Sequence, residues 1–214
     1  MVRCAHTLIF AVAMPATLDI AQIIEIAAVV FSMAAVVLAI KPYTANWPVA
    51  MAGTLLYAWI FFECRLYSDM VLQFIFIGMQ AFGWWQWSQH KTSLIPISSL
   101  TGRQWLTESI VFLAAWGLWT TMLITFLPWL SVLLGIPIPR PAIPWLDSFT
   151  ASLSVWAITL QVRRKWENWV LWLLADIIYI PLYLSVGIPL TALLYMVFLL
   201  LAVFGLRSWY RQRV

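Results

Sequence analysis

NWVLWLLADIIYIPLY, residues 168–183, is apolar over nearly its whole length and carries one acidic residue, Asp176, near its middle. A helix crosses the hydrocarbon core of a bilayer with ~20 predominantly apolar residues, and this stretch with its flanks comes close to that length. The rest of the chain is similar, because 64% of its 214 residues are hydrophobic and 9% are charged. Soluble domains usually carry about 25% charged residues, so the composition indicates a membrane protein.

Further apolar runs predict an all-α integral membrane protein with seven transmembrane helices. The predicted spans are residues 23–40, 46–62, 67–87, 109–134, 147–162, 168–185 and 188–206. Polar or proline-rich segments such as HKTSLIPISSLTGR (90–103) and IPIPRPAIP (136–144) separate some of them. For residues 1–19 we expect a short interfacial helix that is not cleaved, with a signal peptide as the alternative.

The basic residues predict an orientation in the membrane. With seven spans, nine of the twelve Lys and Arg residues fall on the side of the C-terminus, whereas Arg3, Arg65 and Arg140 fall on the other side. Basic loops are retained in the cytoplasm, so we expect the C-terminus inside and the N-terminus outside. Because the basic residues flank apolar runs, the net charge of +4 reflects this orientation rather than nucleic-acid binding.

An internal repeat divides the chain. When the chain is shifted by 122 residues, positions 21–91 lie over 143–213 without a gap and share eleven identical residues. The identities include Asn46-Trp47 with Asn168-Trp169, Tyr57 with Tyr179, Phe82-Gly83 with Phe204-Gly205, and Trp87 with Trp209. The predicted divisions are residues 1–19, a three-helix repeat at 20–91, a loop and linker helix at 92–142, and a second three-helix repeat at 143–214 with a basic tail.

The number of spans in each repeat predicts how the repeats are related. Three spans, one linker span and three more spans leave both copies in the same orientation, as parallel repeats about an axis along the membrane normal. Transporters with internal repeats bind substrate near the midplane, at the interface between the repeats. A receptor or scaffold made by duplication is the alternative, but two near-equal halves favour a two-sided pathway.

Polar and aromatic side chains share one face of the span at 168–185. Its members are Trp169, Trp172, Asp176, Tyr179 and Tyr183, which fall within a sector of about 80° on a helix. The repeat mate of Asp176 is Thr54, and the mate of Tyr195 is Gln73. The candidate substrate-binding residues are Asn46, Thr54, Tyr57, Gln73, Gln80, Asn168, Trp169, Trp172, Asp176, Tyr179, Tyr183 and Tyr195.

The cost of a buried carboxylate makes Asp176 the most informative of these residues. An ionised carboxylate at a helix centre costs roughly 2.5–3.5 kcal/mol on insertion scales, so such residues face a bundle interior or an aqueous cavity. Asp176 is either a structural hydrogen-bonding group or a ligand contact. The flanking rings favour a flat, polar and cationic ligand, held by stacking and by charge. Proton coupling through Asp176 is a second transport hypothesis.

Other residues carry structural interpretations or exclude functions. We expect Trp87 and Trp209 to be interfacial anchors, and Gly83 and Gly205 to permit close helix packing. Paired carboxylates, a nucleophile with its base and a metal-ligand set are all missing from the sequence, so we predict no catalytic residue, metal or cofactor. A membrane sensory or structural subunit is the alternative from a different functional class.

LYSDMVLQFIFIGMQAFGWWQW (66–87) and KWENWVLWLLADIIYIPLYL (165–184) resemble signature regions of the PnuC vitamin transporters. The resemblance covers about residues 20–210. The Trp-x-x-Trp motif of this family stands here as Trp169 and Trp172, preceded by Asn168, and its third-helix Leu-Gln segment stands as Leu72-Gln73. The family often has an amide where this chain has Asp176.

The resemblance implies a function and an assembly. It implies uptake of nicotinamide riboside across a bacterial inner membrane by facilitated diffusion, and trapping of the product by a cytoplasmic kinase. The two repeats themselves predict alternating access, in which they rock about a central site and open it to each side in turn. It also implies a homotrimer and a plan of three, one and three helices like that of the SWEET carriers. Relatives carry thiamine, riboflavin or deoxynucleosides. A carboxylate at position 176 favours a cation such as nicotinamide riboside or thiamine, whereas riboflavin is neutral and larger.

Overall fold

A computed structural model describes residues 20–63, 67–89, 96–135, 143–185 and 189–214, which are helical apart from short connections. The helices are α2 (Ile20–Ile40), α3 (Asn46–Glu63), α4 (Tyr67–Ser88), α5 (Gly102–Thr121), α6 (Leu127–Leu134), α7 (Pro144–Val162), α8 (Asn168–Ser185) and α9 (Pro189–Gln212). A π-helical turn, η2 (Met122–Phe126), joins α5 to α6 in one rod. The described part of the chain thus contains seven helical rods, which confirms the predicted all-α fold and number of helices. The predicted segment 1–19 lies outside the described residues.

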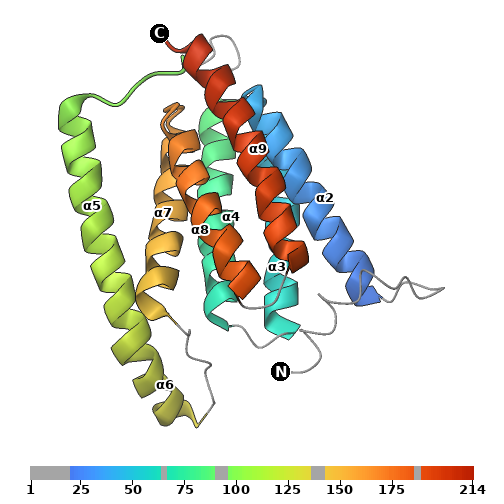
Figure 1. Cartoon of the computed structure of the whole chain (residues 1–214), viewed down its shortest axis with the longest axis vertical. Helices are drawn as coiled ribbons and strands as arrows, with labels where there is room; N and C mark the ends of the chain where they lie inside the picture. Colours follow the sequence, from blue (N-terminus) through green and yellow to red (C-terminus); the bar gives the residue numbers. More distant parts are fainter. Residues whose placement is uncertain (1–19, 64–66, 90–95, 136–142, 186–188) are drawn as a thin grey trace.

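Six of the seven rods form a closed ring. Around the ring, α2 packs against α3, α3 against α4, α4 against α7, α7 against α8, α8 against α9, and α9 against α2. The α5–α6 rod lies outside the ring and contacts α7 (Figure 1). The ring therefore consists of two triplets of consecutive helices, α2–α4 and α7–α9, which meet along α4–α7 and α2–α9.

The π-helical turn in the outer rod has a local cause. Pro128 lies at the beginning of α6, and a proline inside a helix removes one backbone donor and crowds the carbonyl four residues earlier. The helix widens by one residue per turn at this point, so that the N–H of Leu127 donates to the carbonyl of Met122. The rod continues through this turn and covers residues Gly102–Leu134.

Length and hydropathy identify three membrane spans among the described residues. These are Ile23–Ile40, Gly102–Leu134 and Ala192–Gln212. The apolar part of α8, Asn168–Leu182, is shorter. However, α3 and α8 each have 18 residues, and a helix of that length is ~27 Å long, close to the ~30 Å hydrocarbon core. These helices run beside the longer ones in the same bundle (Figure 1).

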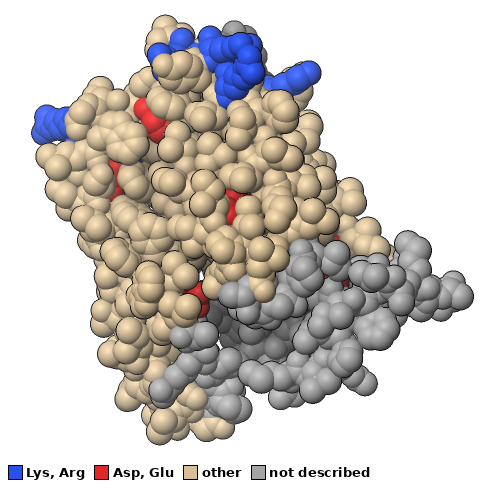
Figure 2. Space-filling view, in the orientation of Figure 1, with Lys and Arg blue, Asp and Glu red and all other residues tan. Residues whose placement is uncertain are grey.

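The charged residues lie unevenly along the bundle. Lys and Arg side chains gather at the end that carries the C-terminus, and the middle of the visible face has almost none (Figure 2). The basic residues of the described ranges belong to this basic end: Lys41, Arg103, Arg163, Arg164, Lys165, Arg207, Arg211 and Arg213. Arg3, Arg65, Lys91 and Arg140 lie outside the described residues.

Four buried tryptophans lie where the two triplets meet at the basic end. Trp47 and Trp87 form an edge-to-face pair with ring centroids 5.1 Å apart, and Trp169 and Trp209 form a second at 5.9 Å. The rings of Trp87 and Trp209 connect these pairs at 6.3 Å. The predicted interfacial position of Trp87 and Trp209 is wrong, since they are only 3% and 0% exposed. Edge-to-face ring contacts and the burial of large rings favour a core position instead.

Hydrogen bonds from this tryptophan cluster tie each triplet to the other. The indole N–H of Trp87 on α4 donates to the carbonyl of Val162 at the end of α7, at 2.8 Å. The indole N–H of Trp209 on α9 donates to the carbonyl of Ala39 at the end of α2, at 2.9 Å. These carbonyls belong to the last turns of their helices, which lack intrahelical donors. The tryptophans therefore satisfy helix ends and join the triplets in the same contact.

Two glycines permit the tryptophan cluster to form, as the sequence predicted. A methyl group on Gly83 would lie 2.7 Å from the Trp47 ring, and one on Gly205 would lie 2.5 Å from the Trp169 ring. Both distances are shorter than a van der Waals contact, so only glycine fits without a shift of the ring. Both glycine–tryptophan pairs are related by the offset of 122 residues.

We predict that Gly83→Ala and Gly205→Ala each lower the free energy of unfolding by about 1–3 kcal/mol, because overpacking a rigid ring strains the core. Gly78→Ala is the matched control, since Gly78 also lies in α4 and has no neighbour within 4 Å of an added methyl group. Denaturant titration of the detergent-solubilised protein measures the effect. Equal stability of the Gly83 and Gly78 variants would contradict this account.

Candidate functional site

Asp176 lies near the middle of α8 and is enclosed by the bundle. It follows the first residue of the helix by eight positions, which corresponds to ~12 Å along a helix of ~27 Å. The residue is 5% exposed, whereas Leu174 and Ile177 on the other side of α8 are 47% and 54% exposed. Among the described residues, the Asp176 carboxylate has no hydrogen-bond or ion-pair partner. Ionisable residues within membrane-spanning segments are rare and often functional, so Asp176 is a candidate functional residue.

The equivalent depth in the first triplet is occupied by a satisfied polar pair. Thr54 on α3 and Gln80 on α4 are both 8% exposed. The Gln80 side-chain amide donates to the Thr54 hydroxyl at 2.9 Å. The Thr54 hydroxyl in turn donates to the Ala50 carbonyl at 2.8 Å. Both groups therefore have partners within their own triplet. No described hydrogen bond connects this pair to Asp176.

Aromatic residues continue the face of α8 away from the basic end. Tyr179 on α8 and Tyr195 on α9 have ring centroids 4.9 Å apart at 50°, and Tyr195 contacts Phe198 edge-to-face at 5.7 Å. In the first triplet, Tyr57 stacks on Phe61 of the same helix at 6.0 Å. The Tyr183 side chain lies outside the described residues. The predicted aromatic face of α8 is thus confirmed for the residues that can be described, and it is partly buried rather than turned to lipid.

Several predicted contact residues are engaged in structural contacts. The side-chain amides of Asn46 and Asn168 donate to the carbonyls three residues earlier, of Tyr43 and Lys165, both at 2.6 Å. These bonds close the turns that begin α3 and α8. Trp169 is 2% exposed and belongs to the tryptophan cluster. These residues hold the helices around the centre of the bundle, at its basic end.

Gln161 joins three helices, and the sequence reasoning missed it. From α7, its amide lies 3.4 Å from the Asn46 oxygen on α3, and its own oxygen accepts from the Trp172 indole on α8 at 3.4 Å. The repeat mate of Gln161 is Ala39, so the internal repeat does not mark Gln161 as a shared polar position. An amide in an otherwise apolar helix could have been found by its polarity alone. Gln161 fixes the Trp172 ring, one turn from Asp176.

Glu25 is the second residue that the sequence reasoning did not select. It lies on α2, is half-buried, and interacts electrostatically with Tyr57 on α3. Gln73 on α4 is half-buried as well. Within the described ranges, no group of three His, Cys, Asp or Glu residues could hold a metal ion. The buried and half-buried polar side chains described above are thus amides, hydroxyls, aromatic rings and carboxylates.

The segment of residues 96–100, which we call the strap, packs against the α7–α8 connection at the basic end. The backbones of Ser98 and residues 164–166 form a parallel bridge, and the N–H of Leu100 donates to the buried Glu167 carboxylate at 2.6 Å. Arg164 lies 4.1 Å above the Trp87 ring, and its burial lowers the pKa of the guanidinium. The strap closes the second triplet over the tryptophan cluster, so the basic end of the bundle is densely packed.

The chain matches the family model described as nicotinamide mononucleotide transporter over residues 22–211. It belongs to this transporter family. The family membership identifies the bundle as that of a multi-pass membrane protein, and it confirms the family resemblance found in the sequence.

Named relatives agree with this membership. The nicotinamide riboside transporter PnuC of Escherichia coli is 26% identical over 181 residues, which cover 77% of this chain and 75% of the relative. The riboflavin/roseoflavin transporter RibM of Streptomyces davaonensis is 22% identical over 166 residues, 77% of this chain and 74% of the relative. The crystal structure of the vitamin B3 transporter PnuC superposes with a TM-score of 0.68 at 25% identity, covering 97% of this chain and 86% of that one. The relatives thus differ in the vitamin that their names give, so membership of the transporter family does not identify the substrate.

We predict that a double-mutant cycle of Thr54→Val and Gln80→Leu gives a coupling of about 0.5–1.5 kcal/mol in the free energy of unfolding, because the two side chains share a buried hydrogen bond. Denaturant titration in detergent measures all four proteins. The matched cycle combines Thr54→Val with Gln73→Leu on the same α4, where no bond to Thr54 is present. Additive effects in the first cycle would show that the pair is not coupled.

Proposed function

We propose that this family member carries nicotinamide riboside into a bacterial cell, and that Asp176 meets the positive charge of the substrate. The observation that carries the proposal is the unpartnered carboxylate of Asp176 at mid-depth in the bundle. A charge in such a place is stabilised by an opposite charge, and a cationic ligand would supply it. The substrate of the Escherichia coli relative, nicotinamide riboside, carries a pyridinium cation.

The charge distribution favours a nucleoside over a nucleotide. The described basic residues lie at the basic end, and the polar side chains described for the middle of the bundle are carboxylates, hydroxyls and amides, together with aromatic rings. A phosphate group beside Asp176 would be repelled without a nearby Lys or Arg. A neutral isoalloxazine, the ring system of the ligands in the name of the Streptomyces relative, would leave the carboxylate without a counter-charge. A cation without phosphate fits the site best.

We assign the remaining predicted residues to two roles. Trp172, Tyr179, Tyr195, Tyr57 and Gln73 would contact the pyridinium ring and the ribose hydroxyls, since rings stack on flat cations and amides bind hydroxyls. The Thr54–Gln80 pair would offer the hydroxyl and carbonyl oxygens on the opposite side. Asn46, Asn168 and Trp169 would position their helices rather than contact the substrate. Tyr183 remains a predicted contact.

For the transport cycle, we propose two parallel three-helix repeats, residues 20–91 and 143–214, joined by the linker helix and moving as alternating-access halves. The two matched glycine–tryptophan pairs support this arrangement, because they join equivalent positions of the two repeats. The indole bonds of Trp87 and Trp209 are reciprocal, with acceptors that differ by one position in the repeat. The dense packing of the tryptophan cluster and the strap corresponds to a pathway closed at the basic end. With basic loops in the cytoplasm, this end and the C-terminus would face inward.

The wider physiology follows from the same proposal. Transport would be facilitated diffusion, and a cytoplasmic kinase would trap the nucleoside by phosphorylation, which adds a charge that the bundle does not accommodate. The protein would act in the inner membrane as a homotrimer of seven-span subunits. Proton coupling through Asp176 is the alternative mechanism. Uptake that is unchanged when the proton gradient is collapsed would exclude it, and uptake that falls would support it.

We predict that purified protein in empty proteoliposomes takes up labelled nicotinamide riboside without another protein. Uptake along the concentration gradient, insensitive to proton-gradient collapse, is the expected result. Labelled thiamine and riboflavin are tested in the same vesicles, and protein-free vesicles are the control. Thiamine uptake without nicotinamide riboside uptake would change the assigned vitamin. If no vitamin crosses, the alternative of a sensory or structural subunit gains support.

We predict that Asp176→Asn weakens binding of nicotinamide riboside about 10-fold or more, because the charge-assisted interaction contributes about 1.5–3 kcal/mol. The neutral analogue with an uncharged dihydropyridine ring should be affected much less. Isothermal titration of the purified protein measures both ligands.

The matched control for this substitution is Glu63→Gln, which removes an exposed carboxylate at the end of α3. It should leave both affinities unchanged. If Asp176→Asn weakens both ligands equally, Asp176 has a structural role and the assigned contact with the cation is wrong.

A further inference from the structure

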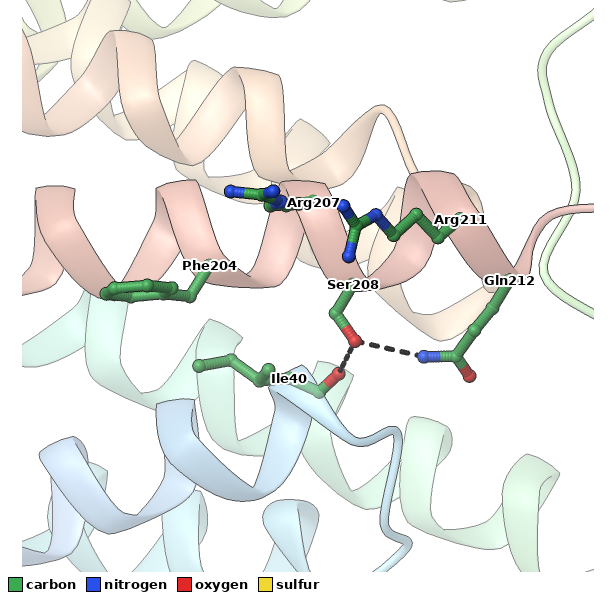
Figure 3. Close-up of a pocket in the computed structure, with 6 residues that line it drawn as sticks. All are labelled: Ile40, Phe204, Arg207, Ser208, Arg211 and Gln212. Carbon is green, nitrogen blue, oxygen red and sulfur yellow. Dashed lines mark hydrogen bonds between the residues drawn. The ribbon is translucent and has the colours of Figure 1, made fainter.

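Two open grooves flank Arg207 and Arg211 at the end of α9. The first, of about 440 Å³, lies between α9 and the last residue of α2 (Figure 3). The second, of about 360 Å³, lies on the other side of the two arginines. The lining residues are Ile40, Phe204, Arg207, Ser208, Arg211 and Gln212 in the first groove, and Trp166, Val203, Leu206, Arg207, Tyr210 and Arg211 in the second. Both guanidinium groups border both grooves.

The polar floor of the first groove is fixed by hydrogen bonds. The Ser208 hydroxyl donates to the Ile40 carbonyl at 3.0 Å, and the Gln212 amide donates to the Ser208 hydroxyl at 2.9 Å (Figure 3). The floor thus joins α9 to α2, along the same seam as the bond from Trp209. A ligand here would rest on a preformed surface.

Among the described residues, no acidic side chain pairs with the two arginines that line the grooves. In the described part of the chain, Arg207 and Arg211 form no side-chain ion pair or side-chain hydrogen bond. The salt bridge found there joins Arg163 to Glu108 instead. No carboxylate lines either groove. Glu167, which follows Trp166 of the second groove in the sequence, is buried and accepts a hydrogen bond from the N–H of Leu100. The two positive charges are therefore available to an anion.

The level of the grooves in the membrane identifies the kind of anion. In the two turns before Arg207, α9 exposes apolar side chains to the surroundings, with Leu200 and Phe204 each 61% exposed and Val203 48% exposed. Tyr210 is 46% exposed, and aromatic residues of this kind lie at the headgroup level of a bilayer. The arginines thus lie where an apolar helix face ends and lipid phosphates begin.

We propose that Arg207 and Arg211 bind the phosphate of an anionic glycerophospholipid, whose two acyl chains lie in the grooves on either side of them. Arg207 and Arg211 border both grooves. In the same way, a single phosphate of a glycerophospholipid is linked to two acyl chains, so the arrangement of charges and grooves matches that of the lipid. Basic pockets between membrane helices on the cytoplasmic side are known to bind such headgroups. Because the lipid would rest on the seam between α2 and α9, it would stabilise the contact between the two triplets. This site is separate from the vitamin site and does not depend on the proposed substrate.

The test uses the full-length protein in a neutral detergent and native mass spectrometry with added phosphatidylglycerol or phosphatidylcholine. We expect phosphatidylglycerol to bind about 30-fold more tightly than phosphatidylcholine, since each basic residue near a lipid surface contributes a factor of about 5. The double variant Arg207→Gln/Arg211→Gln should lose this preference, and each single variant should lose about 5-fold. Phosphatidylglycerol should also raise the unfolding temperature of the unaltered protein but not that of the double variant.

Arg103→Gln is the matched control, because Arg103 is an exposed arginine at the same end of the bundle and borders neither groove. It should retain the full preference for phosphatidylglycerol. Equal binding of the two lipids, or an equal loss in the Arg103 variant, would overturn the proposal. Full competition by millimolar inorganic phosphate would identify a free-anion site instead, and a second protein copy covering α9 in cross-linking would assign the face to an oligomer contact. If the double variant does not fold, the single variants decide the question.

Discussion

A bilayer core supplies no hydrogen-bond partners, and this constraint governs how the bundle is built. Helices satisfy their own backbone groups, so each remaining polar group needs a partner within the protein. The last-turn carbonyls of α2 and α7 receive indole N–H groups from the opposite triplet. Thr54 and Gln80 satisfy one another between α3 and α4. Some buried side-chain atoms of the described residues still lack a partner, among them the indole nitrogens of Trp47 and Trp169 and the Asn168 oxygen. What distinguishes Asp176 is that its carboxyl group lies buried near the middle of its helix.

Glycine makes the tryptophan cluster compatible with this constraint. Gly83 and Gly205 provide the space for the rings of Trp47 and Trp169, whose own indole N–H groups are buried without a partner among the described residues. These rings then support Trp87 and Trp209, which donate across the seam. Packing and hydrogen bonding are thus coupled, and the contact between the triplets depends on four rings and two glycines. The proposed lipid site lies on the outer surface of the same seam.

Sequence reasoning predicted the helices, the inward face of α8 and the role of the glycines, because apolar runs, helical spacing and the repeat each depend on local chain geometry. It misplaced Trp87 and Trp209, since tryptophan near a helix end is common both in interfacial belts and in cores, and the pattern does not distinguish them. It missed Gln161, which matters only through contacts with α3 and α8. It could not foresee that Thr54 pairs with Gln80, because that bond joins two helices at a depth that neither sequence segment encodes.

The two triplets differ in the polar partners that equivalent positions receive. Thr54 corresponds to Asp176, and its partner Gln80 corresponds to Ala202, which is 2% exposed and has no polar side chain. Asn46 and Asn168 differ in the same way, because Gln161 donates to the Asn46 oxygen, whereas the Asn168 oxygen is buried without a partner. In the second triplet the amide is thus replaced by a methyl group just where threonine is replaced by a carboxylate. The second triplet therefore lacks the amide that would pair with the side chain at position 176, and the proposed contact with a cationic substrate depends on this asymmetry.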